Sequence, residues 1–205
     1  MRGHLSVVLV VVALTACANA AVPTNAPRGG RPAVGASPPV QDPWAGLRAR
    51  PLSQWRLAVG QRCPVSSVSR PDPTQFGSAR GNGPVYPVGS DGPIAAGELW
   101  KILWVASPKY LGPVLIRGFR LDGDGYLLFD AANGNHSTQP EVAVPVPNPP
   151  GQWRVNPELD FQDAGTPSGA PWRAWPSYTY APVSGCYAWD VEGNGFSETI
   201  VTEIA

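Results

Sequence analysis

Short apolar stretches recur along residues 44–205 and are separated by Gly, Pro, Asn and Asp. In several stretches large apolar residues alternate with polar or small ones, and this period of two is typical of strands with one buried face. We expect strands at residues 55–59, 100–105, 114–120, 126–129, 141–146, 186–191 and 196–201. No stretch sustains the 3.6-residue repeat of an amphipathic helix. The pattern predicts an all-β, antiparallel β-sandwich, with a partly open barrel as the alternative.

Two turn sequences predict hairpins. Residues 122–125 (Asp-Gly-Asp-Gly) and 192–195 (Glu-Gly-Asn-Gly) each lie between two of the expected strands. Gly, Asn and Asp tolerate the positive φ angles that tight hairpin turns require. The stretch at 141–146 contains Pro145, which cannot donate a ladder hydrogen bond, so we expect this strand at a sheet edge.

Composition narrows the class of protein. The 205 residues include 25 Pro and 23 Gly, well above ordinary usage, in keeping with short strands and many turns. The 15 basic and 15 acidic residues cancel, whereas a nucleic-acid-binding protein would normally carry a basic excess. Hydrophobic residues make up 43% of the chain, enough for a folded core. The length favours one domain with a tail.

The first residues predict export. One arginine is followed by an uncharged apolar segment at 5–14, which is long enough for a signal peptide but too short for an ordinary transmembrane helix. Leu14-Thr15-Ala16-Cys17 resembles the lipobox of bacterial lipoproteins. The resemblance implies that residues 1–16 are a cleaved signal peptide and that Cys17 carries a lipid anchor. The alternative is a simple secretory signal with a chance cysteine beside Ala18-Asn19-Ala20.

The segment after Cys17 has the composition of a linker. Residues 18–43 are rich in Ala, Pro, Gly and Asn and show no apolar periodicity. Such a segment buries too little apolar surface to offset its chain entropy. We therefore expect a lipidated cysteine and flexible tether at 17–43 and one domain at 44–205, with Trp44 or Trp55 fixing the tether to the fold. An ordered strand over the tether is the alternative.

Two cysteines remain once Cys17 is assigned to lipid. In an exported chain Cys63 and Cys186 most economically form one disulfide. Free thiols or a metal pair are the alternatives, but a structural zinc site needs three or four ligands. Beyond the signal the chain has one histidine, His136, and no C-x-x-C motif.

The last hairpin suggests a fold family. Residues 181–193 resemble the final hairpin of secreted immunoglobulin-like bacterial domains, in which a Pro-Gly pair leads into a tyrosine-bearing strand. The resemblance implies an immunoglobulin-like β-sandwich. The chain beyond its signal is also similar to uncharacterised lipoproteins of Gram-positive soil bacteria.

The common catalytic and metal patterns are missing from the sequence. A Ser–His–Asp triad would depend on His136, which lies in a polar loop sequence, and there is no G-x-S-x-G. A copper site needs two histidines. The calcium pattern that could begin at Asp122 fails, because its twelfth position is Asn133. Paired carboxylates of a hydrolase could come from Glu98, Asp124, Glu158, Asp160 and Asp163, but no spacing selects a pair.

Aromatic residues supply the remaining candidates. We expect Trp100, Trp104 and Trp189 to fill the core because they lie in apolar strands. A second group lies among Pro, Gly and Ser, in a segment that we expect to be partly a loop. Its aromatic rings and arginine could stack on a sugar or a Pro-rich peptide. The group comprises Trp172, Arg173, Trp175, Tyr178 and Tyr180. The alternative is that this segment covers an open end of the sandwich and buries its rings.

These observations predict a lipid-anchored, extracytoplasmic binding or scaffold protein that is not an enzyme. We expect no cofactor, no metal and no nucleic acid. Its partners would be a bacterial membrane, reached through lipid on Cys17, and an envelope glycan or another envelope protein. A carbohydrate- or peptidoglycan-binding module using the aromatic segment is the first alternative, and a carboxylate hydrolase is the second.

Overall fold

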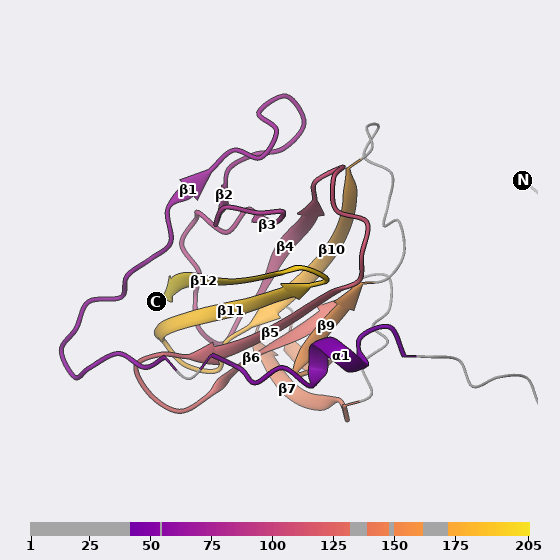
Figure 1. Cartoon of the computed structure of the whole chain (residues 1–205). Coiled ribbons are helices and arrows are strands. Elements are labelled where there is room, and N and C mark those ends of the chain that lie inside the picture. Colours follow the sequence, from indigo (N-terminus) through magenta and orange to yellow (C-terminus); the bar gives the residue numbers. More distant parts are fainter. Residues whose placement is uncertain (1–41, 54, 132–138, 148–149, 162–171) are drawn as a thin grey trace, which may run out of the picture. The chain divides into compact units, whose positions relative to one another are not determined.

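Residues 40–205 form one compact unit in the computed structural model of the chain. The structure describes residues 42–53, 55–131, 139–147, 150–161 and 172–205 (Figure 1). The expected signal peptide, the lipidated Cys17, almost all of the expected tether and His136 lie outside the described residues. What the sequence indicates about them stays a prediction.

The described residues form twelve strands and one four-residue helix, α1 (Ala45–Arg48). All pairings between these strands are antiparallel. The strands are β1 (Val68–Ser69), β2 (Ala79–Arg80), β3 (Val85–Val88), β4 (Leu99–Ala106), β5 (Val114–Arg120), β6 (Tyr126–Ala131), β7 (Val142–Pro147), β8 (Pro150–Val155), β9 (Glu158–Phe161), β10 (Arg173–Tyr180), β11 (Gly185–Gly193) and β12 (Phe196–Ile204). The antiparallel all-β prediction is confirmed, as are both hairpins, β5–β6 and β11–β12.

Ten strands belong to one bent sheet, in the order β1-β2-β3-β4-β10-β6-β5-β11-β12, with β9 also paired to β5. The bend passes through β6, because Leu128–Ala131 of this strand pair with β10 while Tyr126 and Leu127 pair with β5. The two halves of the sheet therefore face each other. The immunoglobulin-like form of the expected sandwich is not established by this strand order.

Hydrogen bonds connect the two ends of the sheet. Ser66, just before β1, donates its backbone N–H to Val201 in β12 over 3.0 Å, and the Val201 N–H donates to the Ser66 hydroxyl over 2.9 Å. Glu198 of β12 accepts the backbone N–H groups of Asn82 and Gly83 over 2.5 and 3.1 Å. The edge of β12 is thus covered, which protects it from pairing with another chain. The ten strands are thus one connected sheet, as the alternative of a partly open barrel expects, rather than two independent sheets.

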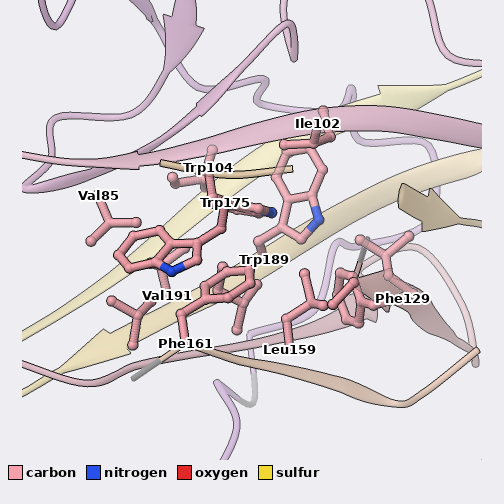
Figure 2. Close-up of a cluster of buried hydrophobic side chains, with 14 of the residues drawn as sticks. Val85, Ile102, Trp104, Phe129, Leu159, Phe161, Trp175, Trp189 and Val191 are labelled. Carbon is pink, nitrogen blue, oxygen red and sulfur yellow. The ribbon is translucent and has the colours of Figure 1, made fainter. Parts of the chain in front are cut away.

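The main core fills the space between the two halves of the sheet. Figure 2 shows its large side chains, which come from β3, β4, β6, β9, β10 and β11: Val85, Ile102, Trp104, Phe129, Leu159, Phe161, Trp175, Trp189 and Val191. The rings of Trp104 and Trp189 meet edge to face with centroids 5.8 Å apart, although β4 and β11 are not neighbours in the sheet. Trp100 packs against the same cluster. The prediction that Trp100, Trp104 and Trp189 belong to the core is confirmed.

An irregular segment covers the outer face of β5, β11 and β12. We call residues 42–53 and 55–66 the strap. Its Leu52, Leu57 and Cys63 pack against a second apolar cluster, which consists of Phe119, Leu121, Cys186, Ala188 and Val201. No strand forms at 55–59, so the prediction there is wrong, and Val59 is fully exposed. Leu57 of this stretch packs on the face of the sheet, which explains the alternation at 55–59, but the stretch is not a strand of the sheet. The Leu57 N–H donates to the Leu121 carbonyl over 2.8 Å.

The strap is fixed at its beginning by Trp44. This indole is 4% exposed, packs with Leu47 and Leu115, and donates Nε1 to the Val114 carbonyl over 3.2 Å. Trp55 is 41% exposed. Of the two tryptophans expected to fix the start of the domain, Trp44 therefore does so. None of the helices that the structure describes is both long and apolar enough to cross a membrane.

Candidate functional site

The predicted disulfide is confirmed. Cys63 of the strap and Cys186 of β11 are bonded, with their Cα atoms 5.4 Å apart and a sequence separation of 123. Both residues therefore belong to the structural framework. Among the described residues no group of three or more His, Cys, Asp or Glu side chains is arranged to hold a metal ion.

The aromatic segment at 172–180 is a central strand rather than a loop. Strand β10 pairs with β4 along its whole length and with β6 from Ser177 to Tyr180. Trp175 points into the core, is 5% exposed, and stacks on Phe161 with centroids 4.9 Å apart and planes 11° from parallel. Trp175 is therefore buried, as the alternative to a ligand-binding surface expects, and its ring is not accessible to a ligand.

The two tyrosines of β10 face the other side of the sheet. The hairpin β7–β8 covers them there, and Tyr180 is buried in a cluster with Val144 and Val155. Tyr178 is half-buried against Trp153, edge to face at 5.5 Å. This covering hairpin explains why neither ring stands free, contrary to their proposed role as a stacking surface.

Arg173 is also a structural residue. Its side chain is buried, and Nη2 donates to the carbonyls of Tyr110 and Gly112 over 2.9 Å each. The guanidinium lies 4.9 Å from the Trp175 ring centroid and 5.5 Å from that of Tyr110. Burial lowers the pKa of Arg173. This arginine braces the turn before β5 instead of facing solvent.

Trp172, at the start of the segment, is half-buried like Tyr178. Its ring meets Phe76 edge-on at 5.4 Å and Tyr86 at 6.3 Å with a 53° tilt. We call Phe76, Tyr86 and Trp172 the ring cluster. All three are partly exposed. Sequence reasoning found only Trp172, because Phe76 and Tyr86 lie about ninety residues away and no local pattern marks them.

The loop that carries Phe76 is held by Asp72. Its carboxylate accepts the Thr74 hydroxyl over 2.6 Å and the Thr74 N–H over 3.0 Å, and its carbonyl accepts the Phe76 N–H over 2.9 Å. The Thr74 hydroxyl is the main reason why the pKa of Asp72 lies below its ordinary value, and the Trp172 indole contributes a smaller part. Asp72 therefore links the loop to Trp172 as well as shaping it.

A hollow of about 320 Å³ adjoins the ring cluster through Phe76. It is lined by Arg70, Pro73, Phe76, Gly77 and Ser78. Arg70 brings a positive charge and several hydrogen-bond donors, whereas the Ser78 hydroxyl already donates to Asp91 and can act only as an acceptor. A partly exposed aromatic face beside polar donors is suited to a ligand that has one apolar face and a polar rim, as a sugar ring has.

The carboxylates that a hydrolase might use are engaged beneath the strap. Glu158 and Asp160 of β9 are buried and accept Arg48 Nε and Nη2 over 2.6 and 2.7 Å. Arg48 also pairs with Asp42 over 2.6 Å. Asp163 lies outside the described residues, and Glu98 and Asp124 are exposed in turns on other parts of the surface. In the described part of the chain, Glu158 and Asp160 dock α1 through Arg48.

No family model and no curated protein matches the chain. Among solved structures, one described as "X-ray Crystal Structure of a Putative Lipoprotein from Bacillus anthracis" is similar over 71% of this chain and 88% of that chain, with 13% identity and a TM-score of 0.37. This likeness is too remote to bear on the fold or the function.

Proposed function

We propose that the chain is an exported lipoprotein, held at a bacterial membrane by lipid on Cys17, whose domain binds an envelope glycan without transforming it. The observation that carries the binding proposal is the partly exposed ring cluster of Phe76, Tyr86 and Trp172 beside the hollow at Arg70. The export and the anchor rest on the apolar segment at 5–14 and on Leu14-Thr15-Ala16-Cys17.

The ring cluster is preorganised for binding. Trp172 directly precedes β10, Tyr86 lies in β3, and Phe76 lies in the loop fixed by Asp72. Rings on such supports lose little conformational freedom when a ligand stacks on them. A sugar ring placed against the aromatic faces would have its hydroxyl groups close to Arg70 and Ser78.

Glycan binding is tested on the full chain in detergent, by following tryptophan fluorescence during titration with soluble peptidoglycan fragments. Trp172→Ala should weaken binding about two- to tenfold, because a stacked ring contributes roughly 0.5–1.5 kcal/mol. Trp55→Ala is the matched control, since Trp55 is exposed elsewhere, on the strap. Unchanged affinity in Trp172→Ala, or the absence of any saturable signal, would overturn the glycan proposal.

The anchor has its own test. The chain recovered from bacterial membranes should begin at Cys17 and carry the added mass of at least one diacylglycerol. Cys17→Ala should move the protein to the soluble extracytoplasmic fraction. An unmodified N-terminus at residue 21, after the Ala18-Asn19-Ala20 sequence, would show a simple secretory signal instead.

A further inference from the structure

A second hollow, of about 560 Å³, lies at the other end of β11 from the start of the strap. Four segments form its walls: the strap at Leu57 and 61–63, the β5–β6 turn at Arg120 and Asp122, the start of β11 at 184–186, and the end of β12 at 203–205. The volume lies in the range of small-molecule sites. The ring cluster contributes no residue to it.

An ion pair is built into one wall of this hollow. Arg120 Nε donates to Asp122 Oδ1 over 2.6 Å. Although burial acts to raise it, the pKa of Asp122 is lowered by hydrogen bonds from Arg120 and from the Cys186 backbone N–H. Gly185 has a φ of +157°, and a Cβ there would lie 2.7 Å from Arg120 Nε and 2.9 Å from Asp122 Oδ1. The glycine thus lets the pair lie directly against the β11 backbone.

Two further charges of opposite sign line the hollow. Arg62 of the strap and Glu203 of β12 are both exposed, and within the described part of the chain neither side chain has a hydrogen-bond or ion-pair partner. The Arg120–Asp122 pair is neutral as a unit. Among the side chains that line the hollow, one cation and one carboxylate are therefore available in addition to the polar wall.

The disulfide fixes the walls to each other. Cys63 and Cys186 both line the hollow, and their bond joins the strap to β11. Covalently fixed walls lower the ordering cost that a ligand must overcome. A charged and polar hollow of this kind suits a hydrophilic ligand that carries one positive and one negative charge.

We propose that this hollow binds a short zwitterionic peptide, whose carboxylate pairs with Arg62 beside the Arg120 guanidinium and whose ammonium group pairs with Glu203. Opposite charges at the two ends of the ligand fix its direction in the hollow, and like charges exclude the reverse direction. The hollow is a site separate from the ring cluster, so the two proposals stand or fall independently.

The test is isothermal titration calorimetry on the full chain in detergent, with trialanine as the probe. We expect saturable binding that falls at least about tenfold when the peptide is N-acetylated and C-amidated, since each lost charge pair removes of the order of 1 kcal/mol or more. Arg62→Gln and Glu203→Gln should each weaken binding about five- to tenfold. Both residues are exposed, so the substitutions should leave the fold intact.

Matched controls separate this site from general charge effects. Arg154→Gln and Glu141→Gln remove one charge of each sign from an exposed pair outside the hollow, and they should change the affinity less than twofold. Trp172→Ala should also leave trialanine binding unchanged, whatever it does to glycan binding. No saturable binding of trialanine, equal binding of the blocked peptide, or unchanged affinity in Arg62→Gln and Glu203→Gln would overturn the proposal.

Discussion

Arg48 in α1 places Nη2 2.7 Å from Asp160 Oδ2 in β9, and the Asp160 side chain has no exposed area. The same guanidinium bonds Glu158, whose side chain is 5% exposed. One cation thus bonds two buried carboxylates, and this arrangement docks the start of the strap on the sheet. Burial acts to lower the pKa of Arg48, but the hydrogen bond and charge of Glu158, with Asp42 and Asp160, raise it above its ordinary value.

Arg48→Met should be strongly destabilising, by about 3–5 kcal/mol, because it removes the cation that bonds Glu158 and Asp160, whose side chains are buried. Urea unfolding followed by tryptophan fluorescence measures the loss. The triple variant Arg48→Met, Glu158→Gln, Asp160→Asn should recover much of it, because no buried charge is then uncompensated. A loss below about 1 kcal/mol in the single variant would contradict this, and would mean that other groups or water compensate the two carboxylates.

Glu192 gives a pH-dependent prediction. Burial raises the pKa of this carboxyl, against the attraction of Arg117 and Arg50. Its Oε2 is buried and has no hydrogen-bond partner among the described residues. The carboxyl of Glu192 therefore holds its proton more tightly in the folded state than in the unfolded chain, where its pKa has the ordinary value of 4.5. Protonated Glu192 therefore contributes to the free energy of unfolding. This contribution is fully present below the unfolded-state pKa and is lost as the pH rises through the raised pKa of the folded state.

Glu192→Gln mimics the protonated state, so the variant should gain stability relative to the natural chain as the pH rises from about 4 to about 7. Urea unfolding of both proteins across that range measures the difference. Glu98→Gln, at an exposed turn, is the control and should show no such trend. A difference that widens toward acid pH would contradict the assignment.

The disulfide should contribute substantially to stability. Its bond closes a loop with a sequence separation of 123, for which the chain-entropy model gives an upper figure of about 5 kcal/mol. Reduction, or Cys63→Ala with Cys186→Ala, should lower the urea midpoint by a corresponding amount. Equal midpoints for oxidised and reduced protein would show that packing of the strap alone holds it in place.

Gly118 should not tolerate a side chain. A Cβ there would lie 2.5 Å from Leu127 Cβ, in the part of the sheet where β5 and β6 pair. Since Leu127 is fully buried, Gly118→Ala should cost about 1–3 kcal/mol through overpacking. Gly46→Ala in α1 has no atom within 4 Å of the new methyl group, so thermal unfolding of this control should be unchanged or slightly shifted upward.

Local sequence signals predicted part of this fold correctly. The turns at 122–125 and 192–195 each form hairpins because a turn joins neighbours in sequence, and the Cys63–Cys186 pairing followed from counting cysteines. The bend of the sheet could not be predicted. It depends on β6 changing partners between Leu127 and Leu128, which no local pattern records.

Strand β10 was missed for a physical reason. Pro176 lacks an N–H group and usually marks an edge or a loop. Here the described pairing of β10 with β6 begins only at Ser177, so Pro176 lies just outside that ladder. The aromatic pattern of the segment predicts a binding surface, whereas Trp175 is core and Trp172 has its surface partners, Phe76 and Tyr86, in distant segments.

The strap determines how the domain would respond to tension applied at its N-terminal end. A pull on residue 42 would first load the ion pairs of Arg48 and the buried Trp44. If these gave way, the strap could peel only as far as Cys63, where the disulfide transfers the force to β11. Fully extended, the released chain from residue 42 to Cys63 would span at most about 70 Å. The strap could therefore detach and lengthen under tension, up to Cys63, before the sheet itself had to unfold.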